Sequence, residues 1–88
     1  MRQKDKKKIY NSKRWKTVRE IVILRDNLLC QQCLKDGFES IGEEVDHIEE
    51  LSDRPDLAYD IDNLQLLCRA CHVQKTYQEK SKRLDLTK

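Results

Sequence analysis

The chain has 88 residues, 39% charged and only 38% hydrophobic, so we expect it to form one domain at most, with a thin core. Its net charge of +2 conceals a segregation. Residues 1–25 carry ten Lys and Arg against two acidic residues, residues 36–62 eleven Asp and Glu against one Arg, and residues 69–88 six Lys and Arg against two acidic residues. Basic ends fit a polyanion such as nucleic acid, and an acidic middle fits a divalent cation, although most charged runs are solvated surface.

The first elements along the chain are a basic arm and an amphipathic helix. We expect residues 1–9 to form a flexible, disordered arm. Asn11 or Ser12 can cap a helix that runs to about Arg25 or Asp26. The apolar side of this helix should pack into the core, with these residues on or beside it: Trp15, Val18, Ile21, Val22, Leu24 and Arg25. Basic residues off that face are candidates for contacts with phosphates: Lys13, Arg14, Lys16 and Arg19.

The rest of the chain alternates turns with short apolar segments and ends in a helix. Residues 44–48 predict a short strand, and Pro55 places a loop at residues 52–57. The apolar residues that lead back into the core are Ile61, Leu64, Leu66 and Leu67. A last helix is expected from about Arg69 to about Lys82. The folded domain should therefore span residues 10–82, with residues 83–88 as a flexible tail.

Four cysteines form two Cys-x-x-Cys pairs, Cys30/Cys33 and Cys68/Cys71. This spacing lets both sulfurs of a pair face one ion, so the four thiolates can close a tetrahedral zinc site. No signal peptide is apparent and no segment is apolar enough to span a membrane, so we expect a reducing, cytoplasmic setting, which favours zinc over two disulfides. A thioredoxin-like redox pair is disfavoured, because no βαβ pattern surrounds either pair. Structural zinc contributes about 10–16 kcal/mol of apparent binding free energy in small metal-dependent domains.

Four further residues lie close to the cysteine pairs in the sequence: Asp46, His47, Asn63 and His72. A zinc ion with four thiolates needs none of them, so they are available for a second function. Each also has an ordinary explanation. His47 can be an exposed strand-end histidine, Asp46 a cap or turn residue, Asn63 the centre of an Asx turn, and His72 a spare zinc ligand or a helix-surface residue.

Taken together, these segments resemble the HNH endonuclease family over roughly residues 10–77. The segments that carry the resemblance are Val45-Asp46-His47, then Asp62-Asn63-Leu64, then Cys71-His72 with Lys75-Thr76 following. The cysteine pairs resemble the zinc-stapled branch of that family, and the helix ending in Leu24-Arg25-Asp26 resembles small phage-type members. The resemblance implies an α+β, ββα-metal (His-Me finger) fold with an N-terminal helix and a structural zinc site made of the four cysteines.

The resemblance also implies a reaction, the metal-dependent hydrolysis of DNA phosphodiester bonds. His47 would activate water as a general base, and Asp46 and His72 would hold Mg²⁺, Mn²⁺ or a similar divalent ion. Asn63 would either orient the segment that carries His47, which we favour, or complete the metal shell. The products would be 5′-phosphate and 3′-hydroxyl ends. Arg69 and Lys75 are further candidates for phosphate contacts.

Two other functions fit the zinc motif alone. One is a non-catalytic zinc-stapled module that binds nucleic acid through its basic ends, and the other is a protein-interaction module that uses the acidic middle. The four residues beyond the cysteines argue against both, because a binding module needs no second metal site. For a nuclease, one active site predicts nicking, with two molecules needed for double-strand cleavage. Phage-type resemblance also permits a role in DNA packaging with a terminase or another specificity partner.

Overall fold

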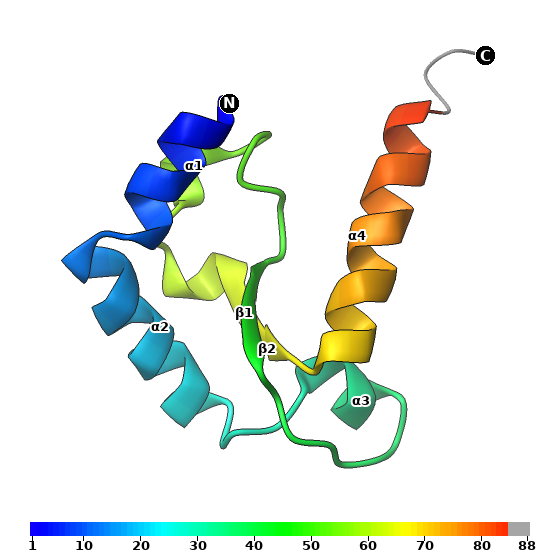
Figure 1. Ribbon diagram of the computed structural model, residues 1–88. Helices are drawn as coiled ribbons and strands as arrows, with labels where there is room; N and C mark the ends of the chain where they lie inside the picture. The colour runs from blue at the N-terminus through cyan, green and yellow to red at the C-terminus, as the bar shows by residue number, and fades with distance from the viewer. Residues whose placement is uncertain (85–88) are drawn as a thin grey trace.

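The computed structural model describes residues 1–84, and it describes the side chains of residues 1–81. Within these residues, four helices, two strands and two 3₁₀ turns follow one another (Figure 1). In chain order they are α1 (Gln3–Tyr10), α2 (Lys13–Arg25), α3 (Gln31–Lys35), β1 (Glu44–His47), the turns Pro55–Leu57 and Ile61–Asn63, β2 (Leu64–Leu67) and α4 (Arg69–Leu84). The predicted small α+β architecture is confirmed. No helix in the described chain combines the length and the apolar character that crossing a bilayer requires.

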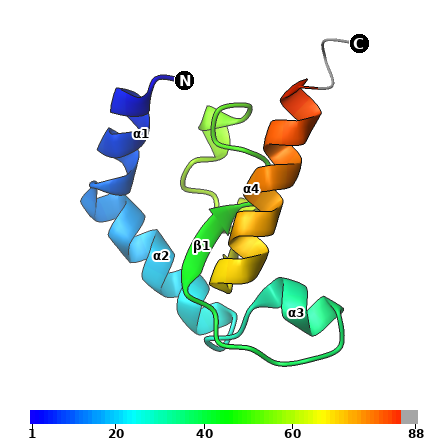
Figure 2. The same cartoon turned by 45° about the vertical axis from the view of Figure 1, so that its right-hand side comes forward.

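The two strands form an antiparallel pair at the centre of the molecule. Their register places Glu44 opposite Leu67 and His47 opposite Leu64. In the view of Figure 2, β1 runs between α2 on one side and α4 on the other. The principal core cluster lies between α2 and the strand pair and consists of Trp15, Val18, Val22 and Leu64, with Val45 and Tyr59 packed against it. The apolar stripe of α2 therefore attaches that helix to the strands that carry the site.

Helix α2 begins and ends as the sequence predicts. The Ser12 hydroxyl accepts a hydrogen bond from the Trp15 N–H at 3.1 Å, which is a standard N-cap. At the other end, the Asp26 carboxylate is buried and accepts from the Leu66 N–H at 2.9 Å. The Arg25 guanidinium donates to the carbonyls of Ile61 and Leu64, both at 2.7 Å. Residues at the end of α2 thus fix the position of β2.

The predicted disordered arm at residues 1–9 is instead largely helical. Helix α1 is joined to α2 by Asn11 and Ser12, and the Ser12 hydroxyl donates to the Ile9 carbonyl at 2.7 Å. The Tyr10 ring packs edge-on against Trp15, with centroids 5.2 Å apart, and this contact orders the end of the helix. At the opposite terminus, α4 extends to Leu84, two residues past the expected limit of the domain. The remainder of the predicted tail, residues 85–88, lies outside the described residues.

Gly42 allows the segment before β1 to approach β2 closely. A Cβ atom at this position would lie 2.3 Å from Cγ of Leu66, which is fully buried. Only glycine fits this approach. The sequence did not single out Gly42, because the requirement comes from a partner 24 residues away rather than from a local turn.

Candidate functional site

The functional residues gather where β1 ends. Successive side chains of a strand point to opposite faces, so Asp46 and His47 should diverge. They do: the His47 ring lies against α2, whereas the Asp46 carboxylate lies against α4 and Gln65. The strand ends at His47, and both side chains line one cleft of about 210 Å³. We expected the strand either to twist or to end at this point, and it ends here.

His47 is held on two sides and is only 5% exposed. Its ring stacks on Trp15 with centroids 5.2 Å apart and an angle of 18° between the planes. Its Nε2 atom lies 3.0 Å from the Ala58 carbonyl oxygen. A carbonyl can only accept, so Nε2 carries the proton and, in the neutral ring, Nδ1 keeps its lone pair. Nδ1 is therefore the atom that can accept a proton.

Asn63 bridges the strand pair to the loop that follows His47. Its side-chain oxygen accepts from the Glu49 N–H at 2.8 Å, and its amide nitrogen donates to the Glu49 carbonyl at 3.1 Å. Its own carbonyl accepts from the Ile48 N–H at 2.8 Å. Because both side-chain polar atoms are used by backbone groups, this geometry fits the orienting role better than the alternative role of metal ligand.

A carboxylate and an imidazole face each other across the cleft. Oδ1 of Asp46 lies 3.8 Å from Nε2 of His72 in the first turn of α4. Two bonds of about 2.1 Å reach across about 4.2 Å, so both atoms can bind one divalent ion. Oxygen and imidazole nitrogen are suitable donors for Mn²⁺, and oxygen for Mg²⁺ as well. Asp46 and His72 therefore fit the predicted cation by the chemistry and the separation of their donor atoms.

Glu44 supports His72 from behind and was not among the residues that the sequence indicated. Its Oε2 lies 2.6 Å from Nδ1 of His72, on the side of the ring away from Asp46. Metal-binding histidines commonly donate their second ring N–H to a carboxylate, which sets the tautomer and the ring orientation. The signal was present in the sequence, because Glu44 and Asp46 are two residues apart and share one face of a strand. The other oxygen of Glu44 accepts from Arg69 at 3.2 Å.

Lys75 ties α4 to the end of β1. Its ammonium lies 2.8 Å from the His47 carbonyl, 2.8 Å from Oε2 of Glu79 and 3.1 Å from Oδ2 of Asp46. Burial lowers the pKa of Lys75, but its hydrogen bond to Glu79 and the nearby charge of Asp46 outweigh burial and raise that pKa overall. Three acceptors match the three N–H donors of an ammonium group. This lysine, predicted to contact phosphate, is thus placed where it holds Asp46 and the strand end.

The other predicted DNA contacts lie outside the cleft. Lys13, Lys16 and Arg19 are exposed on α2, and the Arg14 guanidinium lies 4.4 Å above the ring of Tyr59. The cleft has further lining residues that were not among the predicted site residues: Lys6, Tyr10, Glu50, Leu51, Thr76 and Glu79. Lys6 could not be found from the sequence, because residues 1–9 were expected to be a disordered arm.

The four cysteines form a second cluster, at the starts of α3 and α4. Their sulfur atoms all lie within 4.8 Å of one another, with Cys33 at 3.9 Å from Cys68 and 3.7 Å from Cys71. A tetrahedron of thiolates around zinc at about 2.3 Å has edges of about 3.8 Å, so these distances fit. The backbone N–H of Cys71 is the main cause that lowers the pKa of Cys68, to about 7, which favours the thiolate.

The fold and the site together define a small α+β protein with two histidines and a carboxylate gathered in one cleft at a strand end, and comparisons with known proteins identify the family. The family model for the HNH endonuclease matches residues 30–78. A probable HNH endonuclease of Lactococcus phage SK1 is 44% identical over 75 residues, which cover 81% of this chain and 78% of that protein. The crystal structure of a deep-sea thermophilic bacteriophage GVE2 HNH endonuclease with manganese ion matches with a TM-score of 0.87 and 39% identity, over 90% of this chain and 86% of that one.

The chain belongs to the HNH endonuclease family. It is a metal-dependent nuclease, a phosphodiester hydrolase whose substrate is DNA. The predicted family, fold and reaction are therefore confirmed. The roles assigned to individual residues, and the identities of the two metals, stay predictions.

Proposed function

We propose that His47 is the general base of this nuclease and that Asp46 and His72 hold its Mg²⁺ or Mn²⁺ ion. One observation carries the assignment: all three side chains line one cleft, while the hydrogen bond of His47 to Ala58 leaves Nδ1 as the proton acceptor. The manganese ion in the structure of the GVE2 relative supports a divalent ion here. A binding module would have no use for this arrangement.

The residues of the chain perform the proton transfer and the positioning. Nδ1 of His47 takes a proton from water as the water oxygen bonds to phosphorus, the bond to the 3′-oxygen breaks, and the leaving 3′-oxygen takes a proton from solvent water. The stack on Trp15 and the bond to Ala58 hold the ring while it gains this proton. Asn63 fixes the segment after His47. A bound divalent ion supplies Lewis acidity at the phosphate and the leaving oxygen. The products are 5′-phosphate and 3′-hydroxyl ends.

We further propose that the four-cysteine cluster holds a structural zinc ion. The sulfur separations and the chemistry of four thiolates support it, and all four thiols are free of disulfides. The cluster connects α3 to the start of α4, the helix that carries His72. Zinc at this position would therefore fix one of the two residues proposed to hold the catalytic ion.

The biological setting is proposed from the phage relatives. Similarity to proteins of two phages supports action on DNA inside the host cytoplasm, with packaging beside a terminase as the candidate process. The described residues bring Asp46, His47 and His72 together in one cleft, which supports nicking as the elementary reaction, and double-strand cleavage would need two molecules. Copurification with a terminase encoded in the same genome would test the partnership, and its absence from salt-resistant complexes would contradict it.

Nicking of supercoiled plasmid tests the catalytic proposal. Wild type and His47→Ala are compared with Mg²⁺, with Mn²⁺ and without added divalent ion. Cleavage that requires both the ion and His47 supports the assignment. Equal cleavage by the two proteins would remove His47 as the base, and no cleavage by folded, zinc-loaded wild type in any condition would contradict the proposed function.

A further inference from the structure

Helix α1 is a charged element that the catalytic assignment does not use. Its eight residues include Lys4, Lys6, Lys7 and Lys8, and none of its residues is buried. Short helices are marginal in water, and like charges at spacings of three and four residues destabilise them further. The helix is nevertheless kept in a fixed place by Tyr10, which packs on Trp15 and lies 6.2 Å from the ring of His47.

One side of α1 forms a wall of the catalytic cleft. Lys6 and Tyr10 lie one helical turn apart and line the cleft together with Asp46, His47 and His72. An ammonium and a phenol thus stand at the entrance to a site that is otherwise rich in carboxylates. Both can donate hydrogen bonds to phosphate oxygens.

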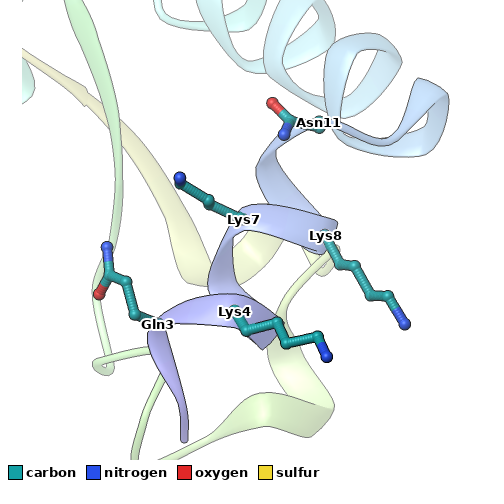
Figure 3. A pocket seen from close by; sticks show the side chains of 5 residues that line it. All are labelled: Gln3, Lys4, Lys7, Lys8 and Asn11. Carbon is teal, nitrogen blue, oxygen red and sulfur yellow. The ribbon is translucent and has the colours of Figure 1, made fainter.

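The adjoining side of α1 carries a second basic surface. A shallow hollow of about 640 Å³ is lined by Gln3, Lys4, Lys7, Lys8 and Asn11 (Figure 3). No carboxylate lines it, and in the described part of the chain no salt bridge involves Lys4, Lys7 or Lys8. Two further groups, the amides of Gln3 and Asn11, can donate to phosphate oxygens.

We propose that α1 binds the DNA backbone beside the scissile bond, with the hollow holding phosphates through Lys4, Lys7 and Lys8 while Lys6 faces the cleft. This inference rests on the proposed function, because it assumes that the cleft holds the reacting strand. A helix of this length spans about 12 Å, and the phosphates of one strand recur about every 3.4 Å along the duplex axis, so the surface can follow a few of them. Phosphates would also relieve the repulsion among these lysines.

The chain offers one competing occupant for this surface. Residues 36–62 of a second copy carry eleven acidic residues against one Arg and are complementary in charge. Such a contact would give a salt-sensitive dimer. We favour DNA because the basic surface continues into the catalytic cleft through Lys6, whereas a second copy placed there would obstruct the substrate.

The test compares two charge-matched variants in a His47→Ala, zinc-loaded background without added divalent ion. Lys7→Gln/Lys8→Gln changes the hollow, and Lys35→Gln/Lys80→Gln removes the same charge at exposed positions that line neither the hollow nor the cleft. Binding of a short duplex is followed by fluorescence anisotropy between about 50 and 200 mM salt. The slope of log K against log salt is negative, and each lost phosphate contact reduces its magnitude by about 0.9. We therefore expect the magnitude to fall by about 1.8 for the first variant and to stay unchanged for the second.

Other outcomes would overturn the inference. An unchanged slope in Lys7→Gln/Lys8→Gln excludes direct contacts, and an equal fall in both variants indicates net charge alone. Sedimentation can also show that the wild type is a dimer. If Lys7→Gln/Lys8→Gln abolishes that dimer and leaves DNA binding intact, the surface binds a second copy of the chain. Amide exchange should slow in residues 3–10 when duplex is added, and unchanged exchange there would also contradict a bound α1. Plasmid nicking by wild type separates the two proposals. If wild type does not nick but the salt slope changes in Lys7→Gln/Lys8→Gln, only the nuclease mechanism is contradicted. If wild type nicks normally but the salt slope does not change in that variant, only this inference is contradicted.

Discussion

The two proposed metal sites of this protein differ in how they are built. The cysteine cluster has four chemically equal ligands in two local pairs, which leave no position open. The cleft has two unlike donors, Asp46 and His72, and each is contacted by a charged residue of another element. A closed site suits a structural ion, and an open one suits an ion that must also meet a substrate. The comparison predicts that mutations at the first site abolish folding, whereas mutations at the second affect the reaction and leave the fold intact.

Loss of one thiolate should have the largest effect. Zinc binding in small domains is worth about as much as the whole stability of a domain, so Cys68→Ser should abolish the cooperative thermal transition. Ser40→Ala is the matched control, because it removes only a 3.4 Å hydrogen bond to the sulfur of Cys33 and should keep both zinc and a cooperative melt. Differential scanning calorimetry with metal analysis measures both. A near-wild-type transition in Cys68→Ser would show that the cluster is not the structural site.

Loss of the proposed general base, His47, should have the second-largest effect. His47→Ala is expected to lower nicking by about 10²–10⁴-fold, the usual contribution of general acid–base catalysis. His47→Gln can still donate to the Ala58 carbonyl but cannot act as the base, so it should be equally inactive while folding better. Rates at saturating Mg²⁺ and circular dichroism of both variants make the comparison. If His47→Gln keeps a rate close to that of wild type, the base lies elsewhere.

Loss of the Glu44 carboxylate beside His72 should have a smaller effect than loss of His47, and the effect should appear in the affinity for the divalent ion. Glu44→Gln removes the carboxylate charge whose Oε2 lies 2.6 Å from Nδ1 of His72, and loss of such a partner typically weakens metal binding by about 10–100-fold. Mn²⁺ affinity can be measured from the electron paramagnetic resonance signal of the free ion, independently of cleavage. Glu43→Gln is the control, since it removes the same charge from an exposed neighbour. Equal affinities for the two variants would contradict the supporting role of Glu44.

The same contrast explains how far the sequence could predict the molecule. The cysteine site, helix α2 and the two strands follow from local patterns: paired cysteines, a Ser12 cap and short apolar segments. The family motif indicated Asp46, His47, Asn63 and His72, and the structure brings three of them to the cleft and places Asn63 behind it. The segments could be identified because each motif is short and local in the sequence, whereas the roles of their residues stay predictions.

The contacts that were missed join residues far apart in the sequence. The Ala58 carbonyl holds His47 from 11 residues away, and any residue offers a carbonyl, so no side chain marks the position. Lys75 reaches the His47 carbonyl from 28 residues away, and a lysine on a helix is indistinguishable in sequence from a solvated one. Helix α1 was predicted as a disordered arm because its composition is that of one, and its order depends on Tyr10 meeting Trp15.

The smallest predicted effect lies at the junction of α1 and α2, outside both metal sites. Ser12→Ala removes the N-cap of α2 and the hydrogen bond to the Ile9 carbonyl, so it should lower the free energy of unfolding by about 1 kcal/mol. For a domain of this size that corresponds to a fall in Tm of about 4–8 °C. Ser12→Asp, which restores a capping acceptor, should recover most of it. Zinc content and Mn²⁺ affinity should stay unchanged in both variants, because Ser12 touches neither site. If Mn²⁺ affinity falls together with Tm, the cleft depends on the stability of α2, and the separation between a site that folds the protein and a site that carries out its chemistry does not hold.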